Sequence, residues 1–178
     1  MTAEELLEKL LKSYQSAFDI TRPYETEKNK YDAYAAFNVT SAKYVLVKKA
    51  ELWRADCYEH AFFMRRDRLM PDDLDTFHKD LEAFIEPKLV RDGEKCTPEN
   101  HMYTYITGIF ICEGGLLEEG KKAVERFRYF KNYRFGLRGY CEGRLLVFDM
   151  KEHKIVGNKA AKELVKGYTK AFQPFYIQ

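Results

Sequence analysis

The sequence lacks a charge excess, a cysteine pattern and a catalytic signature. Its 30 Lys and Arg residues are nearly balanced by 28 Asp and Glu residues, so no global field draws the chain toward nucleic acid or an anionic membrane. Its four cysteines include no CxxC pair, which indicates reduced thiols. The Walker loop, GxGxxG, GxSxG and HExxH motifs are missing as well. We therefore expect no cofactor and assign no catalytic residue.

Long hydrophobic runs are also missing. The N-terminus carries acids within its first five residues, and no apolar stretch reaches the length of a signal peptide or a membrane span. This pattern predicts a cytoplasmic protein with no membrane partner. With 178 residues and 46% hydrophobic content, the chain is long enough to build one core without metal or disulfide support. We expect a single globular domain over residues 1–178.

Hydrophobic periodicity predicts the element order α-β-β-β-α-β-α-β-β-α, an α+β fold with about four helices on a mixed, mostly antiparallel sheet of about five to six strands. The expected helices are 3–17, a helix opened by Pro71 and ended or kinked by Pro87, 116–131, and 159–171 with Asn158 as its cap. The expected strands are 31–38, a hairpin of 43–53 and 57–65, a doubly covered strand 102–112, 133–150 and 155–156.

The stretch 121–144 combines basic and aromatic residues, a composition typical of nucleic-acid surfaces. Its helical part is explained by packing, because one arc of the helix is apolar and Glu118 and Lys122 are spaced to pair in solvent. That arc contains Leu116, Leu117, Gly120, Ala123, Val124, Phe127 and Phe130. The helical part therefore carries no functional argument.

The strand part of this stretch suggests a binding face. Alternation along a strand places Arg134, Arg138, Tyr140 and Arg144, together with Glu142, on one face. The opposite face would bury Tyr133, Phe135, Leu137, Cys141, Leu145 and Val147. Three arginines and a tyrosine could hold an anionic ligand or a nucleic-acid strand. In the alternative interpretation, these arginines pair with acids such as those of the helix 72–86. Gly136, Gly139 and Gly143 leave the register open, since glycine in a strand often marks a bulge.

The element order resembles that of the core of restriction-like nucleases, which would imply a metal site. In those enzymes a carboxylate on one strand and a Glu-x-Lys pair on the next bind Mg²⁺. Glu51, Asp56 and Glu59 occupy the corresponding hairpin, but Ala61 stands where the lysine is required. Solvated carboxylates on a hairpin are the simpler interpretation, and a metal-dependent hydrolase is kept as an alternative.

Three further features bear on function. The aromatic residues Phe62, Phe63, Tyr103 and Tyr105 could line a small-molecule pocket, although core packing explains such residues more simply. His78 borders the apolar face of its helix, where Glu82 could be its partner, and we expect a half-buried packing role. The tail residues Phe172, Phe175, Tyr176 and Ile177 are expected to pack on their own domain or on a second copy in a homodimer.

The sequence favours a non-catalytic binding module with an anionic ligand or nucleic acid as its partner. The alternatives are the metal-dependent hydrolase and the small-molecule pocket.

Overall fold

The computed structural model describes residues 1–37 and 56–176, with side chains for 1–37 and 57–172. Within these residues the expected α+β class is confirmed: four α-helices pack on a mixed sheet of seven strands. The helices are α1 (Ala3–Tyr14), α3 (Pro71–Asp80), α4 (Glu118–Arg126) and α5 (Lys162–Tyr176). The sheet contains β1 (Phe18–Thr21), β4 (Ala33–Phe37), β5 (Asp56–Arg66), β6 (His101–Cys112), β7 (Phe130–Asn132), β8 (Tyr140–Asp149) and β9 (Lys154–Gly157); β2 (Tyr24–Glu25) and β3 (Lys30–Tyr31) form a separate hairpin.

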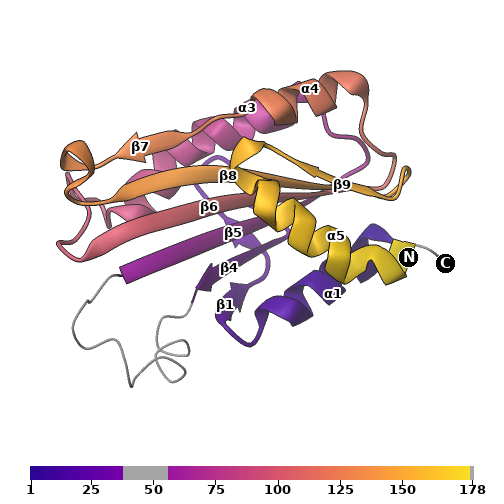
Figure 1. The fold of residues 1–178 in the computed structure, drawn as a ribbon, viewed down its shortest axis with the longest axis horizontal. Helices are drawn as coiled ribbons and strands as arrows, with labels where there is room; N and C mark the ends of the chain where they lie inside the picture. The colour runs from indigo at the N-terminus through magenta and orange to yellow at the C-terminus, as the bar shows by residue number, and fades with distance from the viewer. Residues whose placement is uncertain (38–55, 177–178) are drawn as a thin grey trace.

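Three parallel strands form the centre of the sheet (Figure 1). β6 lies between β5 and β8, which confirms the central, doubly covered strand expected over 102–112. β4 and then β1 extend the sheet beyond β5 in antiparallel pairs, while β7 and β9 pair antiparallel with opposite ends of β8. Antiparallel pairs thus outnumber parallel ones.

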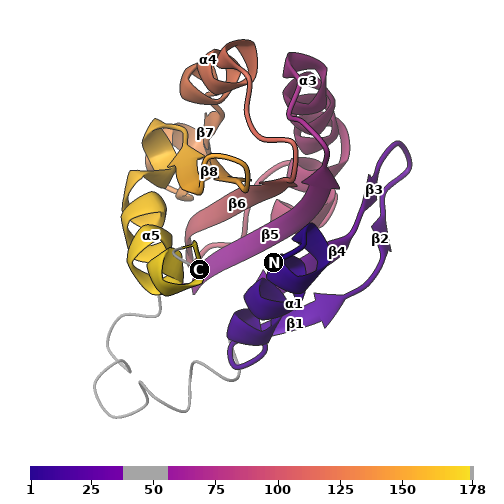
Figure 2. The same cartoon turned by 90° about the vertical axis from the view of Figure 1, so that its right-hand side faces the viewer.

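The sheet is the middle one of three layers (Figure 2). The chain returns from β5 to β6 through α3 and the π-helix η1 (Leu81–Val90), and from β6 to β8 through α4 and β7. Because parallel neighbours need such crossovers, these helices cover one face, and α1 and α5, from the two ends of the chain, cover the other. Alternation along the strands fills both cores: Phe62 and Phe110 pack under the crossover helices, and Phe63 and Ile109 pack under α1 and α5.

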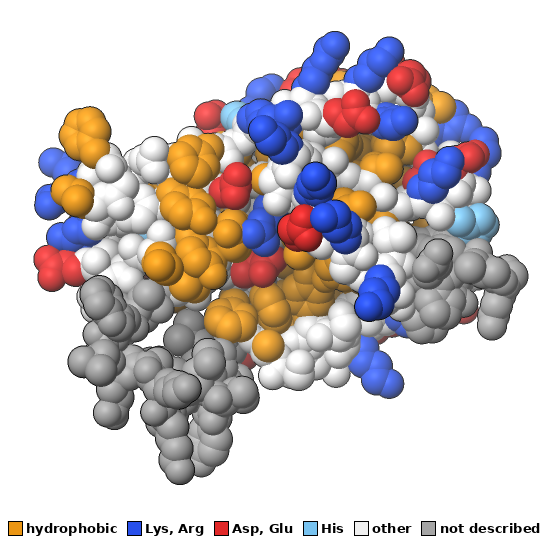
Figure 3. Space-filling model, viewed as in Figure 1, with side chains coloured by type: hydrophobic (Ala, Val, Ile, Leu, Met, Phe, Trp, Pro, Cys, Tyr) orange, Lys and Arg blue, Asp and Glu red, His pale blue; other side chains and the backbone are white. Residues whose placement is uncertain are grey.

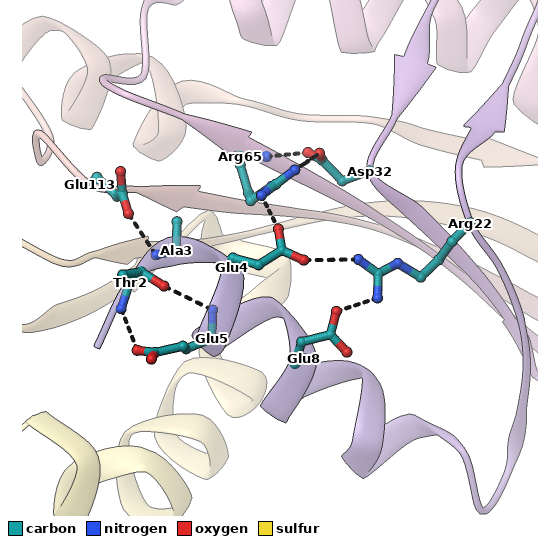
Figure 4. Close-up of polar contacts among 9 residues, drawn as sticks. All are labelled: Thr2, Ala3, Glu4, Glu5, Glu8, Arg22, Asp32, Arg65 and Glu113. Atoms are coloured by element: carbon teal, nitrogen blue, oxygen red, sulfur yellow. Dashed lines mark hydrogen bonds and ion pairs between the residues drawn. The ribbon is translucent and has the colours of Figure 1, made fainter.

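Helix α1 is fixed over the carboxyl ends of the parallel strands (Figure 4). Thr2 and Glu5 form a capping box at its first turn. The Ala3 N–H donates to Glu113 Oε1 over 2.7 Å, just beyond the end of β6. Glu4 pairs with Arg65 near the end of β5. This end of the sheet is therefore closed by α1.

Of the two expected effects of Pro87, an end or a kink of its helix, the structure contradicts the first. The chain continues from α3 into the π-helix η1, which contains Pro87 and runs to Val90. In an α-helix the proline ring clashes with the carbonyl four residues earlier, and the wider π-helical turn leaves it room.

No described helix has the length and hydrophobicity needed to span a bilayer.

The region 116–150 departs most from the expected elements. α4 ends at Arg126 rather than at 131, because the backbone at Phe127 takes an extended ψ of 128°. Phe130 consequently belongs to β7 and is 58% exposed instead of filling the helix arc. The strand expected over 133–150 begins only at Tyr140, after a turn that contains the 3-10 segment η2 (Arg134–Gly136).

Other predicted features agree with the structure or lie outside it. Asn158 caps the last helical segment as expected, since its side chain accepts from the Ala161 N–H over 3.2 Å. The predicted strand 43–53 lies outside the described residues, whereas its expected hairpin partner is β5. The hairpin β2–β3 and strand β1 were not predicted, because their runs are too short to show a period.

Candidate functional site

The sheet face beneath α1 and α5 is covered along only part of its length. Strand pairing aligns side chains of β5, β6 and β8 in rows across this face. Two rows at the carboxyl ends of the strands, Phe63–Ile109–Leu146 and Arg65–Ile111–Phe148, lie near the helices, and their apolar members are fully buried. Figure 1 looks onto this face and shows α1 and α5 crossing the right-hand part of the sheet.

The three rows toward the amino ends of the strands carry polar and aromatic side chains instead. These rows are Cys57–Tyr103–Tyr140, Glu59–Tyr105–Glu142 and Ala61–Thr107–Arg144. We call them the open half-sheet. All of its members are half-buried except Ala61 and Thr107, which are fully buried. In Figure 3, hydrophobic side chains gather over the left-hand part of this face, with acidic and basic groups among them.

Aromatic rings form the floor of the open half-sheet. Tyr140 stacks on Tyr103 at 5.9 Å between ring centroids and on Phe130 of β7 at 5.4 Å. The Tyr140 and Tyr105 hydroxyls lie 3.3 Å apart and share a hydrogen bond. That bond, together with partial burial, raises the pKa of Tyr140 to about 12. A groove of about 380 Å³ adjoins this floor between β7, β8 and the 3-10 segment η3 (Lys159–Ala161), with Phe130 and Glu142 in its wall.

Arg144 lies at the inner border of the aromatic floor. Its guanidinium carbon is 3.0 Å from the centroid of the Tyr105 ring, a cation–π contact. Its Nε is buried and has no hydrogen-bond partner among the described residues. A charged donor that loses water without gaining an acceptor costs folding free energy. The site therefore offers an unsatisfied cationic donor against an aromatic surface.

Glu59 faces the same region from β5. The Thr107 hydroxyl donates to its Oε1 over 2.8 Å. Loss of hydration raises the pKa of the Glu59 carboxyl, and the Thr107 hydrogen bond and the charge of Arg144 oppose that rise. At about 4.8 Å between strands and about 6.6 Å between rows, the Glu59 and Arg144 backbones lie on the order of 12 Å apart.

A pair of tyrosines separates the open half-sheet from the apolar core. The Tyr168 hydroxyl of α5 donates to the Tyr14 hydroxyl of α1 over 2.7 Å. Burial raises the pKa of Tyr14 well above its usual value, and the nearby Glu59 charge raises it further. The Tyr14 ring packs edge-on against Phe63 at 5.3 Å. This pair joins the two helices where the covered rows begin.

The structure divides the predicted arginine face into two parts. Tyr140 and Arg144 share the open half-sheet. Arg134 and Arg138 lie in the turn before β8, so they do not continue this strand face. Arg138 pairs with Glu99 at 3.0 Å rather than with the helix 72–86. The alternation failed here because strand geometry does not begin until residue 140.

The other predicted sites are placed as follows. Glu51 lies outside the described residues, as does the side chain of Asp56, so the three-carboxylate metal site stays a prediction. Within the described part of the chain, no three His, Cys, Asp or Glu side chains are grouped to hold a metal ion. The half-buried position of His78 is confirmed: its side chain is 35% exposed, and its Nδ1 lies 3.7 Å from Glu82 Oε2.

The predicted aromatic and tail residues also lie in different parts of the structure. Phe62 and Phe63 are core residues, on opposite faces of β5, whereas Tyr103 and Tyr105 belong to the open half-sheet. Phe172 is buried against Phe148. Phe175 and Tyr176 lie at the end of α5. Their side chains and the whole of Ile177 lie outside the part of the chain that the structure describes. Self-association through the tail therefore stays a prediction.

Sequence reasoning did not identify Thr107 as the partner of Glu59, nor the contact of Tyr105 with Arg144. Alternation alone could have placed Tyr103, Tyr105 and Thr107 on one face of β6. Nothing local shows that β6 is flanked by β5 and β8 in parallel register, and that register is what brings Glu59 and Arg144 to one surface.

The chain was compared with curated proteins, solved structures and family models. Neither a curated protein nor a solved structure matches this chain. The family model described as "Domain of unknown function (DUF8052)" matches residues 2–170, a span that runs from the cap of α1 into α5 and includes the whole open half-sheet. The chain therefore belongs to this family, a domain of unknown function (DUF8052).

Proposed function

We propose that the open half-sheet binds a small, flat or apolar molecule that carries one negatively charged group, and that it does so without catalysis. The observation that carries this proposal is the buried, unpartnered Nε of Arg144 above the Tyr105 ring. The proposal unites two hypotheses from the sequence, an anionic partner at Tyr140 and Arg144 and an aromatic pocket at Tyr103 and Tyr105.

The chemistry of Arg144 defines one end of the ligand. A guanidinium presents forked donors that match a carboxylate, sulfonate or phosphate, and charge-assisted hydrogen bonds are stronger than neutral ones. An anionic group beside Nε would supply the missing acceptor. Stacking on Tyr105 fixes the plane of the guanidinium, which reduces the entropy lost on binding.

The remaining side chains define the body of the ligand. The rings of Tyr103, Tyr140 and Phe130 offer stacking faces, as small-molecule sites commonly do. Glu59 faces the ligand from the β5 side, where its carboxylate repels a second negative charge and accepts a hydrogen bond from a hydroxyl or amide. We expect selectivity for a single anionic group on an aromatic frame.

Calorimetric titration of the full chain with 2-naphthoate and with neutral 2-naphthamide tests this. The carboxylate is expected to bind more tightly, and Arg144→Gln is expected to weaken naphthoate binding by about tenfold or more, equivalent to about 1.4 kcal/mol. Naphthamide binding should change little. Naphthoate should also raise the melting temperature of the unmodified protein, because it binds only the folded state.

Arg126→Gln is the matched control, since Arg126 is exposed on α4 on the opposite side of the sheet. It should leave naphthoate affinity unchanged. The proposal fails if neither compound binds at millimolar concentration, or if Arg144→Gln and the unmodified protein bind naphthoate equally.

A further inference from the structure

The turn between β7 and β8, residues 133–139, exposes the two most exposed large apolar side chains of the described residues. Phe135 is fully exposed, at 104%, and Leu137 is 83% exposed. Both were expected on the buried face of a strand. The turn forms the left-hand end of the molecule in Figure 1, where Figure 3 shows apolar side chains protruding with basic and acidic ones around them.

The turn is rigidly built. Backbone hydrogen bonds of 3.0–3.1 Å link residues within it, including Arg138 N–H to Tyr133 O and Gly139 N–H to Gly136 O. The Thr97 hydroxyl donates to the Arg138 carbonyl over 2.7 Å and ties the turn to the loop before β6. Phe135 adopts a left-handed φ of 55°, which a side chain of this size rarely takes. The apolar side chains are thus held outward by a defined backbone.

The segment that leads into and through the turn is basic, although Glu99 of the loop before β6 lies beside it and pairs with Arg138. Between Glu125 and Glu142 the chain carries five basic residues and no acid: Arg126, Arg128, Lys131, Arg134 and Arg138. Lys131 and Arg138 are paired with Glu86 and Glu99. Arg134 is exposed beside Phe135, where its charge is available to a partner.

We propose that this turn docks the protein on a membrane surface that contains anionic lipid. Phe135 and Leu137 enter the boundary between headgroups and acyl chains, and the exposed Arg134 contacts lipid phosphates. The docking is peripheral and requires no spanning helix, so it departs from the expectation of no membrane partner, which was based on the lack of long apolar runs. It is independent of the ligand proposed for the open half-sheet, although β8 begins directly after the turn, so that site lies beside the docked surface.

The shape of the turn favours a membrane over nucleic acid. Single-stranded nucleic acid binds in basic grooves where bases stack on ring faces. On this turn the apolar side chains protrude from the surface and do not line a groove. One of them, Leu137, has no aromatic ring on which a base could stack. Two protruding apolar side chains next to the cationic Arg134 can insert into the interfacial region of a lipid bilayer.

Co-sedimentation of the full chain with vesicles tests the proposal. Phosphatidylcholine vesicles that contain phosphatidylserine are expected to bind the protein more tightly than phosphatidylcholine alone, and added salt should weaken that binding. Phe135→Ser with Leu137→Ser should lower the partition coefficient by about tenfold or more, because the inserted apolar surface is lost. Arg134→Glu should lower it for the anionic vesicles only.

Leu117→Ser, at a 40% exposed side chain beside α4, is the matched control and should bind as the unmodified protein does. Phe135→Trp in a Trp53→Phe background, which removes the native tryptophan, supplies a second readout, since its fluorescence should shift to shorter wavelength when anionic vesicles are added. Absence of binding to anionic vesicles, or undiminished binding by the double serine variant with native circular dichroism, would overturn the proposal. So would a Phe135→Trp emission that vesicles leave unchanged, or binding to single-stranded RNA in place of vesicles.

Discussion

Buried polar side chains in this protein differ in whether their polar atoms have hydrogen-bond partners. Glu86 illustrates the first: it is 1% exposed, yet Arg91, Lys131 and Tyr133 all donate to its carboxylate at 2.7–2.9 Å. These partners lower the pKa of Glu86 against the opposing effect of burial. Glu86 therefore has a structural role. Arg144 has no equivalent acceptor at Nε within the described part of the chain, so a bound anion would complete its hydrogen bonding.

His60 is a second residue whose protonation is tied to the fold. Its Nδ1 lies 2.7 Å from the Tyr34 hydroxyl, and the two rings stack. Burial lowers the pKa of His60 from 6.5 to about 4, and a backbone hydrogen bond to Leu89 only partly opposes this. The folded protein therefore holds the neutral imidazole under conditions where the unfolded chain takes up a proton.

This difference predicts a loss of stability in mild acid. Because the folded pKa is depressed, the contribution of His60 is complete above pH 6.5 and is lost as the pH falls toward about 4. The full loss is up to about 3 kcal/mol in the free energy of unfolding. Urea titrations of the unmodified protein and of His60→Gln between these pH values measure it, and the variant should show the weaker pH dependence.

The pH dependence of the unmodified protein is the reference for this comparison. Parallel stability profiles for His60→Gln and the unmodified protein would show that His60 does not titrate as described.

At the scale of elements, the turn 133–139 depends on glycine for two different reasons. Gly139 has a φ of 73°, and a Cβ there would lie 2.2 Å from the Met102 carbonyl oxygen. Gly136 has a φ of 89°, but a Cβ there would meet no atom within 4 Å. Gly139 is therefore required both for the left-handed backbone and for the close packing of the turn against β6. Gly136 is required for the left-handed backbone alone.

Alanine substitutions should separate these two effects. Gly136→Ala is expected to lower the free energy of unfolding by about 1 kcal/mol, the usual cost of a left-handed residue with a Cβ. Gly139→Ala should cost roughly 3 kcal/mol, because the carbonyls of β6 must also move. Chemical denaturation measures both. Equal costs at the two positions would mean that the turn does not pack on β6 as closely as the structure has it.

At the scale of the whole molecule, the sheet has a closed end and an open end. α1 closes the carboxyl ends of the parallel strands mainly through its buried leucines Leu6, Leu7 and Leu10. The surrounding ion pairs of Arg22 and Arg65 are partly exposed, so each adds little. Among the described residues no helix gives the amino ends of β5, β6 and β8 such an apolar cover, and the polar and aromatic rows lie there.

This asymmetry predicts a pattern of amide hydrogen exchange. The amides of Ile109 and Ile111 in β6 should exchange only through global unfolding, since β6 has a neighbour on each side and a core on each face. The three-residue edge strand β7 should exchange by local opening at a lower free energy. Native-state exchange followed by mass spectrometry or NMR checks this, and β7 amides as protected as those of β6 would contradict it.

What the sequence determined by itself was mainly local. The period of α1, the two-sided apolar run of β6 and the cap at Asn158 follow from interactions between residues a few positions apart, and the structure confirms each of them. The α+β class also followed, because element types and their order limit the possible layers. The sequence likewise identified Tyr140 and Arg144 as neighbours on one strand face.

Only the tertiary structure decided which side chains meet. Glu59, Tyr105 and Arg144 come from three strands whose parallel register depends on contacts between residues 35 or more positions apart, and alternation within one strand carries no information about it. The same holds for Phe135, whose apolar character predicted burial. The end of α4 at Arg126 and the left-handed backbone of the turn place it in solvent, because pairing of β7 with β8 fixes where the chain must reverse.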